Sequence, residues 1–276
     1  MKFIFIAYAD EKMAYSLKRI GHQAKRLGIF DEIILYTPQD LPDDLKATPL
    51  MQNSYGGGYW AWKPWIIQHT LDTHENGDVV CYVDAGCTLH GNRNEWNNYL
   101  KLIGQYDTIL FQYPDEMPVW ERFGTTSTKI KHWTKKKSVL FYDDLLGNDE
   151  WREHNKILGG FLFAKGKNNP IIETWLDMVF NHPDIIDDSG VFEDQFPFFV
   201  RHKHDQPMLT ALSCKFSDRC IVLPELLDEG PEDAAVVAER VRVANFGQYL
   251  IWVSKKGIKK LMGQQFVSRI KSIVKR

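Results

Sequence analysis

The residues best placed to do chemistry follow an apolar run that has the pattern of a buried strand. Val79-Val80-Cys81-Tyr82-Val83 leads directly into Asp84-Ala85-Gly86. In open α/β sheets, ligands bind outside the carboxyl ends of the strands. Asp84 is therefore placed to hold a divalent cation or a ribose hydroxyl, and Gly86 lets a diphosphate approach the backbone. The alternative is that Asp84 only caps the turn after the strand.

A second candidate segment, rich in glycine and aromatic residues, runs from Tyr55 to Trp65. Its three glycines allow a tight loop, its rings offer stacking surfaces, and Lys63 stands at a predicted helix start. Such a segment suits an anionic ligand with a planar ring, such as a nucleotide diphosphate. The alternative is that its tryptophans are core anchors. We expect at least one of them to be core and Lys63 to be functional.

The third candidate is Arg201-His202-Lys203-His204-Asp205-Gln206-Pro207. Asp205 could act as a general base, or it could bind a metal together with the two histidines. Histidines two positions apart lack the helical spacing of a zinc site, which disfavours zinc. The alternative for Asp205 is a helix N-cap. Upstream, Gly159-Gly160 either lets an acceptor sugar approach the backbone or forms a simple loop.

These segments must be positioned by regular elements. We expect strands over residues 2–9, 32–36, 78–84, 107–112, 160–165 and 220–223, and helices over 10–28, 64–73, 93–103, 170–180 and 204–212. Residues 123–137 are polar and basic and receive no assignment. Strands that alternate with helices predict an α/β fold with a mostly parallel sheet flanked by helices.

Composition limits the classes of function. The 276 residues, 44% hydrophobic and 13% aromatic, are typical of one globular domain. The formal net charge is -2, but residues 247–276 hold eight basic side chains and no acid, so a nucleic-acid-binding body is disfavoured. The four cysteines lack C-x-x-C spacing, which favours a reducing cytoplasm. No signal peptide, membrane span, phosphate-binding loop, dinucleotide motif or serine-hydrolase elbow is predicted.

Three segments in this order resemble a bacterial glycosyltransferase family of the GT-A fold, found in polysaccharide gene clusters. The matching pieces are Gly58–Trp65, Gly77–Cys87 and His202–Gln206, and the resemblance spans about residues 2–223. It implies a GT-A-like, Rossmann-type sheet in a single domain. In such enzymes an Asp-x-Asp at a strand end holds the metal and the donor diphosphate. Asp84 takes that position here, with Gly86 in place of the second carboxylate.

The resemblance also implies roles for individual residues. Mn²⁺ or Mg²⁺ would bind Asp84 less firmly than a complete pair, and Lys63 could neutralise the diphosphate instead. The implied catalytic residue is Asp205. The implied donor-binding residues are Tyr8, Ala9, Asp10, Tyr59, Trp60, Lys63, Asp84, Ala85 and Gly86, and the implied acceptor-binding residues are Gly159, Gly160 and His204.

The expected function follows from the resemblance. It is transfer of a hexose from a nucleotide-sugar donor, such as a UDP-sugar, to a saccharide or lipid-linked acceptor in capsule or O-antigen synthesis. One alternative is a non-catalytic partner that binds nucleotide-sugars, favoured by the missing second aspartate. A nucleotidyltransferase is a third option, but no glycine-rich loop at the first strand supports it.

The C-terminal segment predicts a membrane contact. We divide the chain into a body, residues 1–246, and a tail, residues 247–276. Between Lys255 and Arg276, apolar residues recur at steps of three and four, with basic residues between them. A basic amphipathic helix lies on an anionic membrane surface, which predicts a cytoplasmic protein held peripherally at the inner face of the membrane. The alternative is a solvated helix docked on the body.

Overall fold

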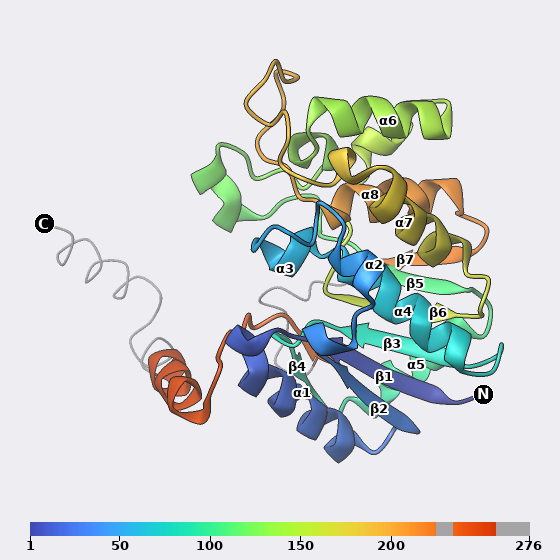
Figure 1. The fold of residues 1–276 in the computed structure, drawn as a ribbon, viewed down its shortest axis with the longest axis vertical. Helices are drawn as coiled ribbons and strands as arrows, with labels where there is room; N and C mark the ends of the chain where they lie inside the picture. Colours follow the sequence, from blue (N-terminus) through green and yellow to red (C-terminus); the bar gives the residue numbers. More distant parts are fainter. Residues whose placement is uncertain (225–233, 258–276) are drawn as a thin grey trace, which may run out of the picture.

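One six-stranded sheet organises the chain. The structure, a computed structural model, describes residues 1–224 and 234–257. The strand order is β2-β1-β3-β6-β5-β7 (Figure 1). The strands are β1 (Phe3–Tyr8), β2 (Glu32–Tyr36), β3 (Val79–Val83), β5 (Thr108–Phe111), β6 (Phe161–Lys165) and β7 (Cys220–Leu223). In this sheet β6 runs antiparallel to its neighbours β3 and β5, while the β1–β2, β1–β3 and β5–β7 pairs are parallel. The predicted mostly parallel α/β sheet is confirmed.

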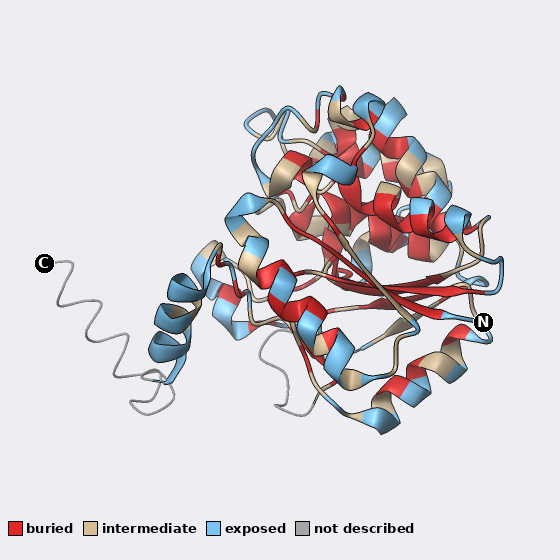
Figure 2. Cartoon of the chain, turned by 60° about the horizontal axis from the view of Figure 1, so that its bottom comes forward, coloured by how far each residue is buried: buried red, intermediate tan, exposed pale blue. Residues whose placement is uncertain are grey.

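The central strands are apolar because both faces of the sheet are covered. Every residue of β1 and β3 is buried, as expected for strands inside a parallel sheet. On one face, the ring of Phe3 packs against Phe30 and against Trp96 of α5 (Arg93–Ile103). On the other face, Tyr8 and Tyr82 pack against Trp62 of α4 (Trp62–Thr73). Figure 2 shows the buried strands between the two helical layers.

The helices divide between these two faces. They are α1 (Ala14–Leu27), α2 (Asp43–Lys46), α3 (Gly56–Tyr59), α4 (Trp62–Thr73), α5 (Arg93–Ile103), α6 (Lys136–Leu146), α7 (Pro170–Asn181) and α8 (Asp205–Lys215). α4, α7, α8 and α6 pack against one another in sequence on one face, and α1 and α5 lie on the other. A two-stranded sheet joins β4 (Thr88–Leu89) to β8 (Val236–Val237).

Local sequence signals mark several helix ends. The carboxylate of Asp10 accepts from the amide of Lys12 at 3.1 Å and caps the short 3-10 helix η1 (Glu11–Met13), which leads into α1. α1 stops at Gly28, whose φ of 62° is left-handed. The side chain of Asn92 accepts from the amide of Glu95 and caps α5.

The unassigned stretch 123–137 holds structure that the sequence pattern did not predict. It includes the end of the 3-10 helix η3 (Pro118–Phe123), the 3-10 helix η4 (Ile130–Trp133) and the start of α6. Short 3-10 turns carry no apolar periodicity. α6 begins among three lysines, Lys135 to Lys137, of which Lys135 is fully buried.

The first part of the predicted tail is helical. Residues 246–257 form a helix whose rings at Phe246 and Tyr249 pack against Tyr15 of α1. Lys256 pairs with Glu239. The remainder of the predicted amphipathic helix, from Ile258 onward, lies outside the described residues.

Candidate functional site

A cavity of about 770 Å³ opens where β1 and β3 end and β6 begins. It brings together residues from segments that are far apart in the sequence. The predicted site residues that line it are Tyr8, Ala9, Asp10, Trp60, Lys63, Asp84, Ala85, Gly86, Gly159, Gly160, His204 and Asp205. Tyr59 is not among its lining residues; it is buried behind the wall, where its ring packs against His204 at 5.1 Å.

At the centre of the cavity, one buried ammonium lies between two carboxylates. Lys63 is in the first turn of α4, and its side chain is 2% exposed. Its Nζ lies 2.9 Å from Oδ2 of Asp205 and 3.5 Å from Oδ1 of Asp84. It also donates to the carbonyl of Gly159 at 2.7 Å. Asp84 is 38% exposed and Asp205 is 9% exposed, so Asp84 is the more accessible carboxylate.

The electrostatics of this trio favour a charged lysine. Burial alone lowers the pKa of Lys63, but Asp205 and Asp84 outweigh burial and raise that pKa above its ordinary value. The three protons of the ammonium all have partners within the protein. A direct bond from Lys63 to a phosphate, as expected from the sequence, would therefore require one of these contacts to break.

Gly159 and Gly160 make room for the two carboxylates. A Cβ at Gly159 would lie 2.4 Å from Oδ2 of Asp205, and a Cβ at Gly160 would lie 2.9 Å from Oδ2 of Asp84. The amide of Asp84 donates to the carbonyl of Gly160 at 2.8 Å. The glycine pair therefore lets the backbone approach the carboxylates of Asp84 and Asp205 closely. A simple loop would not require glycine at these two positions.

The loop after Asp84 is held by an arginine that sequence reasoning missed. Arg19, on α1, donates to the carbonyl of Ala85 at 3.3 Å and to Oγ1 of Thr88 at 2.9 Å, and it also bonds to the carbonyl of Cys87. Asp84 accepts a hydrogen bond from the hydroxyl of Tyr82. Burial and Asp84 raise the pKa of that hydroxyl, so it remains a donor. The side chain of Asp84 therefore points to Lys63 and Tyr82 and does not cap the turn.

The aromatic segment divides between core and cavity. Trp62 is buried and stacks on Tyr8 at 3.9 Å between ring centroids, so at least one tryptophan is core, as expected. Tyr59 and Trp60 have φ angles of 52° and 60°. Among the described residues, the other non-glycine residues with positive φ are His204 and Arg240, both in the cavity wall. Such backbone strain concentrates at functional sites.

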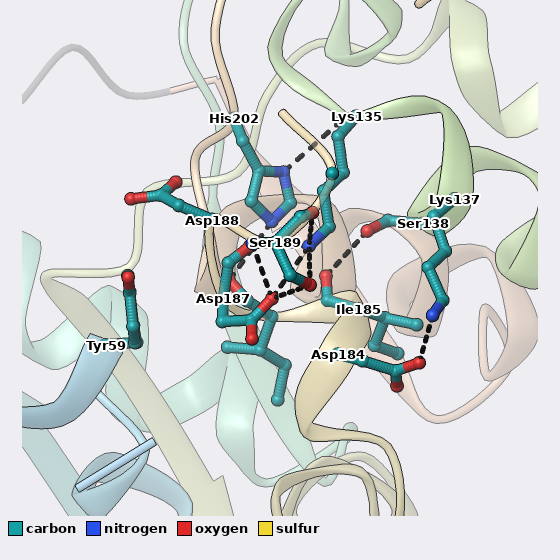
Figure 3. A network of polar contacts seen from close by, with 12 residues as sticks. Tyr59, Lys135, Lys137, Ser138, Asp184, Ile185, Asp187, Asp188, Ser189 and His202 are labelled. Carbon is teal, nitrogen blue, oxygen red and sulfur yellow. Dashed lines mark hydrogen bonds and ion pairs between the residues drawn. The ribbon is translucent and has the colours of Figure 1, made fainter. Parts of the chain in front are cut away.

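The two histidines of the third segment have separate partners. His204 precedes α8, and its Nε2 lies 3.0 Å from Oδ1 of Asp188. The buried Nε2 of His202 donates to the carbonyl of Ile186 at 3.1 Å, and its Nδ1 accepts from the amide of Lys135 (Figure 3). Asp205 is the first residue of α8 and its carboxylate binds Lys63, so its helix-cap interpretation is wrong.

Figure 3 also shows what holds the chain that leads to His202 and Asp205. The ammonium of Lys135 donates to the carbonyl and to Oδ1 of Asp187, at 2.6 and 3.0 Å, and to the carbonyl of Ser189 at 2.9 Å. This network ties the start of α6 to the loop before α8. It therefore holds in place part of the segment that leads to Asp205 in the cavity wall.

The cavity has further lining residues that were not predicted. Among the described residues, its wall holds seven basic side chains against three acidic ones, an excess of four positive charges. The basic ones other than Lys63 are Lys12, Arg122, Lys156, Lys203, Arg240 and Arg242. The available signal was the aromatic composition of residues 113–133. No pattern in the sequence placed Arg240 and Arg242 there.

Comparisons with known proteins give weak structural likenesses. No family model and no curated protein matches this sequence. A glycosyltransferase involved in the glycosylation of the major capsid of PBCV-1 matches with a TM-score of 0.42 and 12% identity, over 81% of this chain and 82% of that one. Mouse xyloside xylosyltransferase 1 matches at 0.39 and 10%, over 81% and 85%. The galactosyltransferase LgtC matches at 0.39 and 11%, over 79% and 72%.

At this level of likeness, the chemistry must be read from the cavity itself. Its carboxylates offer two groups that can accept a proton or orient a hydroxyl, namely partly exposed Asp84 and buried Asp205. Its cations offer an anion-binding wall. The described residues include no group of three or more His, Cys, Asp or Glu side chains arranged to hold a metal ion.

Proposed function

We propose that the chain is a glycosyltransferase that moves a hexose from a nucleotide-sugar, such as a UDP-sugar, to a saccharide or lipid-linked saccharide acceptor. The observation that carries the proposal is the arrangement of Asp84 and Asp205 around Lys63 in a cavity whose described wall is rich in basic side chains. A nucleoside diphosphate carries negative charge and a planar base. The cavity offers complementary groups for both.

The donor belongs on the β1 side of the cavity. Tyr8, Ala9 and Asp10 follow β1, and Lys12, Arg240 and Arg242 lie on the same side. The segment with the two arginines is fixed there because the amide of Val241 donates to the carbonyl of Gly86, and its own carbonyl accepts from Ser16. We propose that the base and ribose contact residues 8–10 and that the basic side chains neutralise the diphosphate.

The metal that the GT-A resemblance implies does not fit the described side chains well. Both carboxylates near its expected position already face the ammonium of Lys63, and a divalent cation beside that ammonium would meet electrostatic repulsion. We therefore propose that Lys63 supplies the positive charge at Asp84. In this arrangement Asp84 orients the donor sugar or ribose, and Asp205 orients the acceptor hydroxyl or accepts its proton.

The pathway and the location are also proposals. The helix over residues 246–257 exposes Phe246, Leu250, Ile251 and Val253, which supports contact between the tail and a membrane surface. Within residues 1–224 and 234–257, no helix is long and apolar enough to span a bilayer. A peripheral enzyme at the inner face would meet a lipid-linked acceptor of capsule or O-antigen synthesis.

The test is UDP release from a panel of UDP-sugars, with and without Mn²⁺ and with a chelator. We expect turnover in the chelated sample.

Asp84→Asn should keep the fold and lower turnover at least about tenfold, the effect of losing about 1.4 kcal/mol of transition-state stabilisation. Asp205→Asn should lower the chemical step by about 10²- to 10⁴-fold while UDP affinity stays unchanged. The matched control is Asp72→Asn, on the exposed side of α4.

Two outcomes would contradict the proposal. One is the absence of nucleoside diphosphate binding, measured by calorimetry. The other is wild-type turnover in Asp84→Asn. Binding of a UDP-sugar without release of UDP under any metal condition would instead support the non-catalytic partner.

A further inference from the structure

A histidine in the cavity wall has a strained backbone. His204 is the residue before α8, and its φ and ψ angles are 52° and -97°. Residues other than glycine rarely adopt such a positive φ, and strain of this kind clusters at functional sites. His204 is 3% exposed and lines the cavity directly before Asp205. Its conformation therefore places an imidazole beside the carboxylate that we assign to the acceptor hydroxyl.

Three aromatic rings of one segment hold this imidazole. Its ring centroid lies 5.2 Å from that of Tyr55, 5.1 Å from that of Tyr59 and 5.5 Å from that of Trp60. The backbone of residues 56–60 has positive φ throughout, so the segment forms a left-handed turn beside His204. The rings restrict the orientation of the imidazole.

A carboxylate sets which ring nitrogen of His204 carries the proton. Nε2 lies 3.0 Å from Oδ1 of Asp188. An ionised carboxylate only accepts hydrogen bonds, so Nε2 of the neutral imidazole is the donor and Nδ1 carries a lone pair. The neighbours of Asp188 in the chain, Asp187 and Ser189, are held by the ammonium of Lys135 (Figure 3). The segment that presents Asp188 is therefore fixed.

The other ring nitrogen of His204 is open to the cavity. Within residues 1–224 and 234–257, Nδ1 has no hydrogen-bond partner, and it is not among the polar side-chain atoms enclosed there without one. It is therefore accessible, and the space that His204 lines is the cavity. Burial lowers the pKa of His204; Asp188 and Asp205 oppose this effect, and Lys203 adds to it. The imidazole is thus neutral at neutral pH and can take up a proton at Nδ1.

Asp205 is less suited to take up a proton. Its Oδ2 accepts a hydrogen bond from the ammonium of Lys63 at 2.9 Å. Protonation of Asp205 would remove the negative charge that pairs with this buried ammonium. Protonation of His204 at Nδ1 breaks no contact within the described residues, and it places the new positive charge next to Asp188.

We infer that His204 accepts the proton of the acceptor hydroxyl and that Asp188 positions it for this step. The hydroxyl proton moves to Nδ1, and the hydroxyl oxygen bonds to the anomeric carbon of the donor sugar. The bond from that carbon to the diphosphate breaks, and its electron pair leaves with the diphosphate. The imidazolium is stabilised by Asp188 and then gives its proton to water. Asp205 orients the hydroxyl. This inference rests on the proposed function, because it assigns the base of the same reaction.

The first experiment observes the imidazole without any substrate. Long-range nitrogen–proton NMR of the full-length protein at neutral pH distinguishes protonated from unprotonated ring nitrogens, and the His204→Gln variant assigns the signals. We expect His204 to carry its proton on Nε2 alone. In Asp188→Asn the new amide can donate, so part of the population should carry the proton on Nδ1 instead. A proton on Nδ1 in the wild type overturns the inference.

The second experiment measures UDP release from the same panel of UDP-sugars. His204→Gln, whose amide can still donate to Asp188, should lower turnover about 10²- to 10⁴-fold and leave UDP affinity unchanged. Asp188→Asn should lower turnover at least about tenfold, because it favours the wrong tautomer. The matched controls are His22→Gln and Asp72→Asn, both at exposed positions, and they should keep the turnover of the wild type.

His204→Gly separates a chemical role from a structural one. Glycine adopts the backbone angles of His204 without strain, so this variant should fold. Added imidazole should raise its turnover about tenfold or more and should not raise that of the wild type. A purely structural histidine would give no response to imidazole.

Wild-type turnover in His204→Gln, or no response of His204→Gly to imidazole, overturns the inference. If the wild type still binds UDP and releases it from a UDP-sugar, these results leave the glycosyltransferase proposal standing, with Asp205 as the proton acceptor. A wild type that neither binds UDP nor releases it would remove both.

Discussion

Lys63 connects the chemistry of the cavity to the stability of the fold. A buried ammonium is unfavourable unless it is paired and hydrogen-bonded, and here two carboxylates and a carbonyl meet it. The same contacts bring α4, the end of β3 and the start of α8 to one point. Substitution of this lysine therefore affects folding as well as ligand binding.

Lys63→Met should lower the free energy of unfolding by about 3–5 kcal/mol, because it leaves buried Asp205 without its partner. Urea unfolding followed by circular dichroism measures the change. Adding Asp205→Asn to Lys63→Met removes the uncompensated charge and should recover part of the loss. Wild-type stability in Lys63→Met would show that the ion pair does not hold the site together.

His202 makes stability depend on pH. The pKa of His202 lies well below 6.5. Burial is the main cause, and the positive charges of His204 and Lys135 lower the pKa further. The unfolded chain therefore takes up a proton first as the pH falls. The free energy of unfolding should decrease below about pH 6.5, by up to about 1.4 kcal/mol per pH unit for this group.

The measurement is urea unfolding at a series of pH values between neutral and mildly acidic conditions. His202→Gln should flatten the slope, because glutamine does not titrate. His22→Gln on α1 is the control, and its slope should match that of the wild type. Equal slopes for His202→Gln and the wild type would show that His202 does not control acid stability.

At the residue scale, the sequence singled out Asp84, Lys63 and Asp205 as site residues but did not predict the ion pairs between them. Asp84, Lys63 and Asp205 stood out because each follows a recognisable local signal. The pairing of Lys63 with both carboxylates depends on tertiary structure. α4 and α8 are far apart in the sequence and are brought together because both pack against α7. Arg19 was missed because an arginine on a helix such as α1 is usually expected at the surface. In the structure it instead bonds to the loop after Asp84.

At the scale of elements, periodicity and caps carried most of the information. β2, α5 and β7 have the predicted bounds, because each is a short apolar or amphipathic run with clear stop signals. α6 was missed because its first turn is lysine-rich. The burial of Lys135 depends on Asp187 and Ser189, which are more than fifty residues away. That polar network could not be deduced from local sequence.

The tail gives a prediction about an element. Of its eight basic residues, six follow Gly257. Deletion after Gly257 keeps the helix that packs on Tyr15 and removes those six charges, each of which contributes about 1 kcal/mol near an anionic surface. The full-length protein should sediment with anionic liposomes, and the shortened one should not. Activity on a soluble acceptor should be unchanged.

Neutral liposomes are the control for the tail, and they should bind neither protein strongly. Equal sedimentation of both proteins with anionic liposomes would place the membrane contact elsewhere or remove it. In that case the helix over residues 246–257 would be a docked element of the body. Its ring contacts with Tyr15 and the pair between Lys256 and Glu239 fit that alternative.

At the scale of the whole molecule, charge is distributed unevenly. The chain has a formal net charge of -2, yet the described wall of the cavity carries an excess of four positive charges. A cleft lined by one sign of charge concentrates ligands of the opposite sign. The sequence indicated positive charge in the tail and in residues 123–137. It did not indicate the positive charge of the cavity, because the cavity gathers its cations from six separate segments of the chain.

UDP affinity should therefore fall as ionic strength rises. The screening length decreases from about 10 Å at 0.1 M salt to about 3 Å at 1 M, so attraction across the cavity weakens over that range. The double variant Arg240→Gln/Arg242→Gln should bind UDP more weakly at 0.1 M and depend less on salt, with Kd measured by calorimetry. Lys18→Gln/Lys101→Gln, with both positions exposed on α1 and α5, changes net charge equally and should behave as the wild type. Equal salt dependence in both double variants would mean that Arg240 and Arg242 do not contact the diphosphate, and the donor would then have to be placed elsewhere in the cavity.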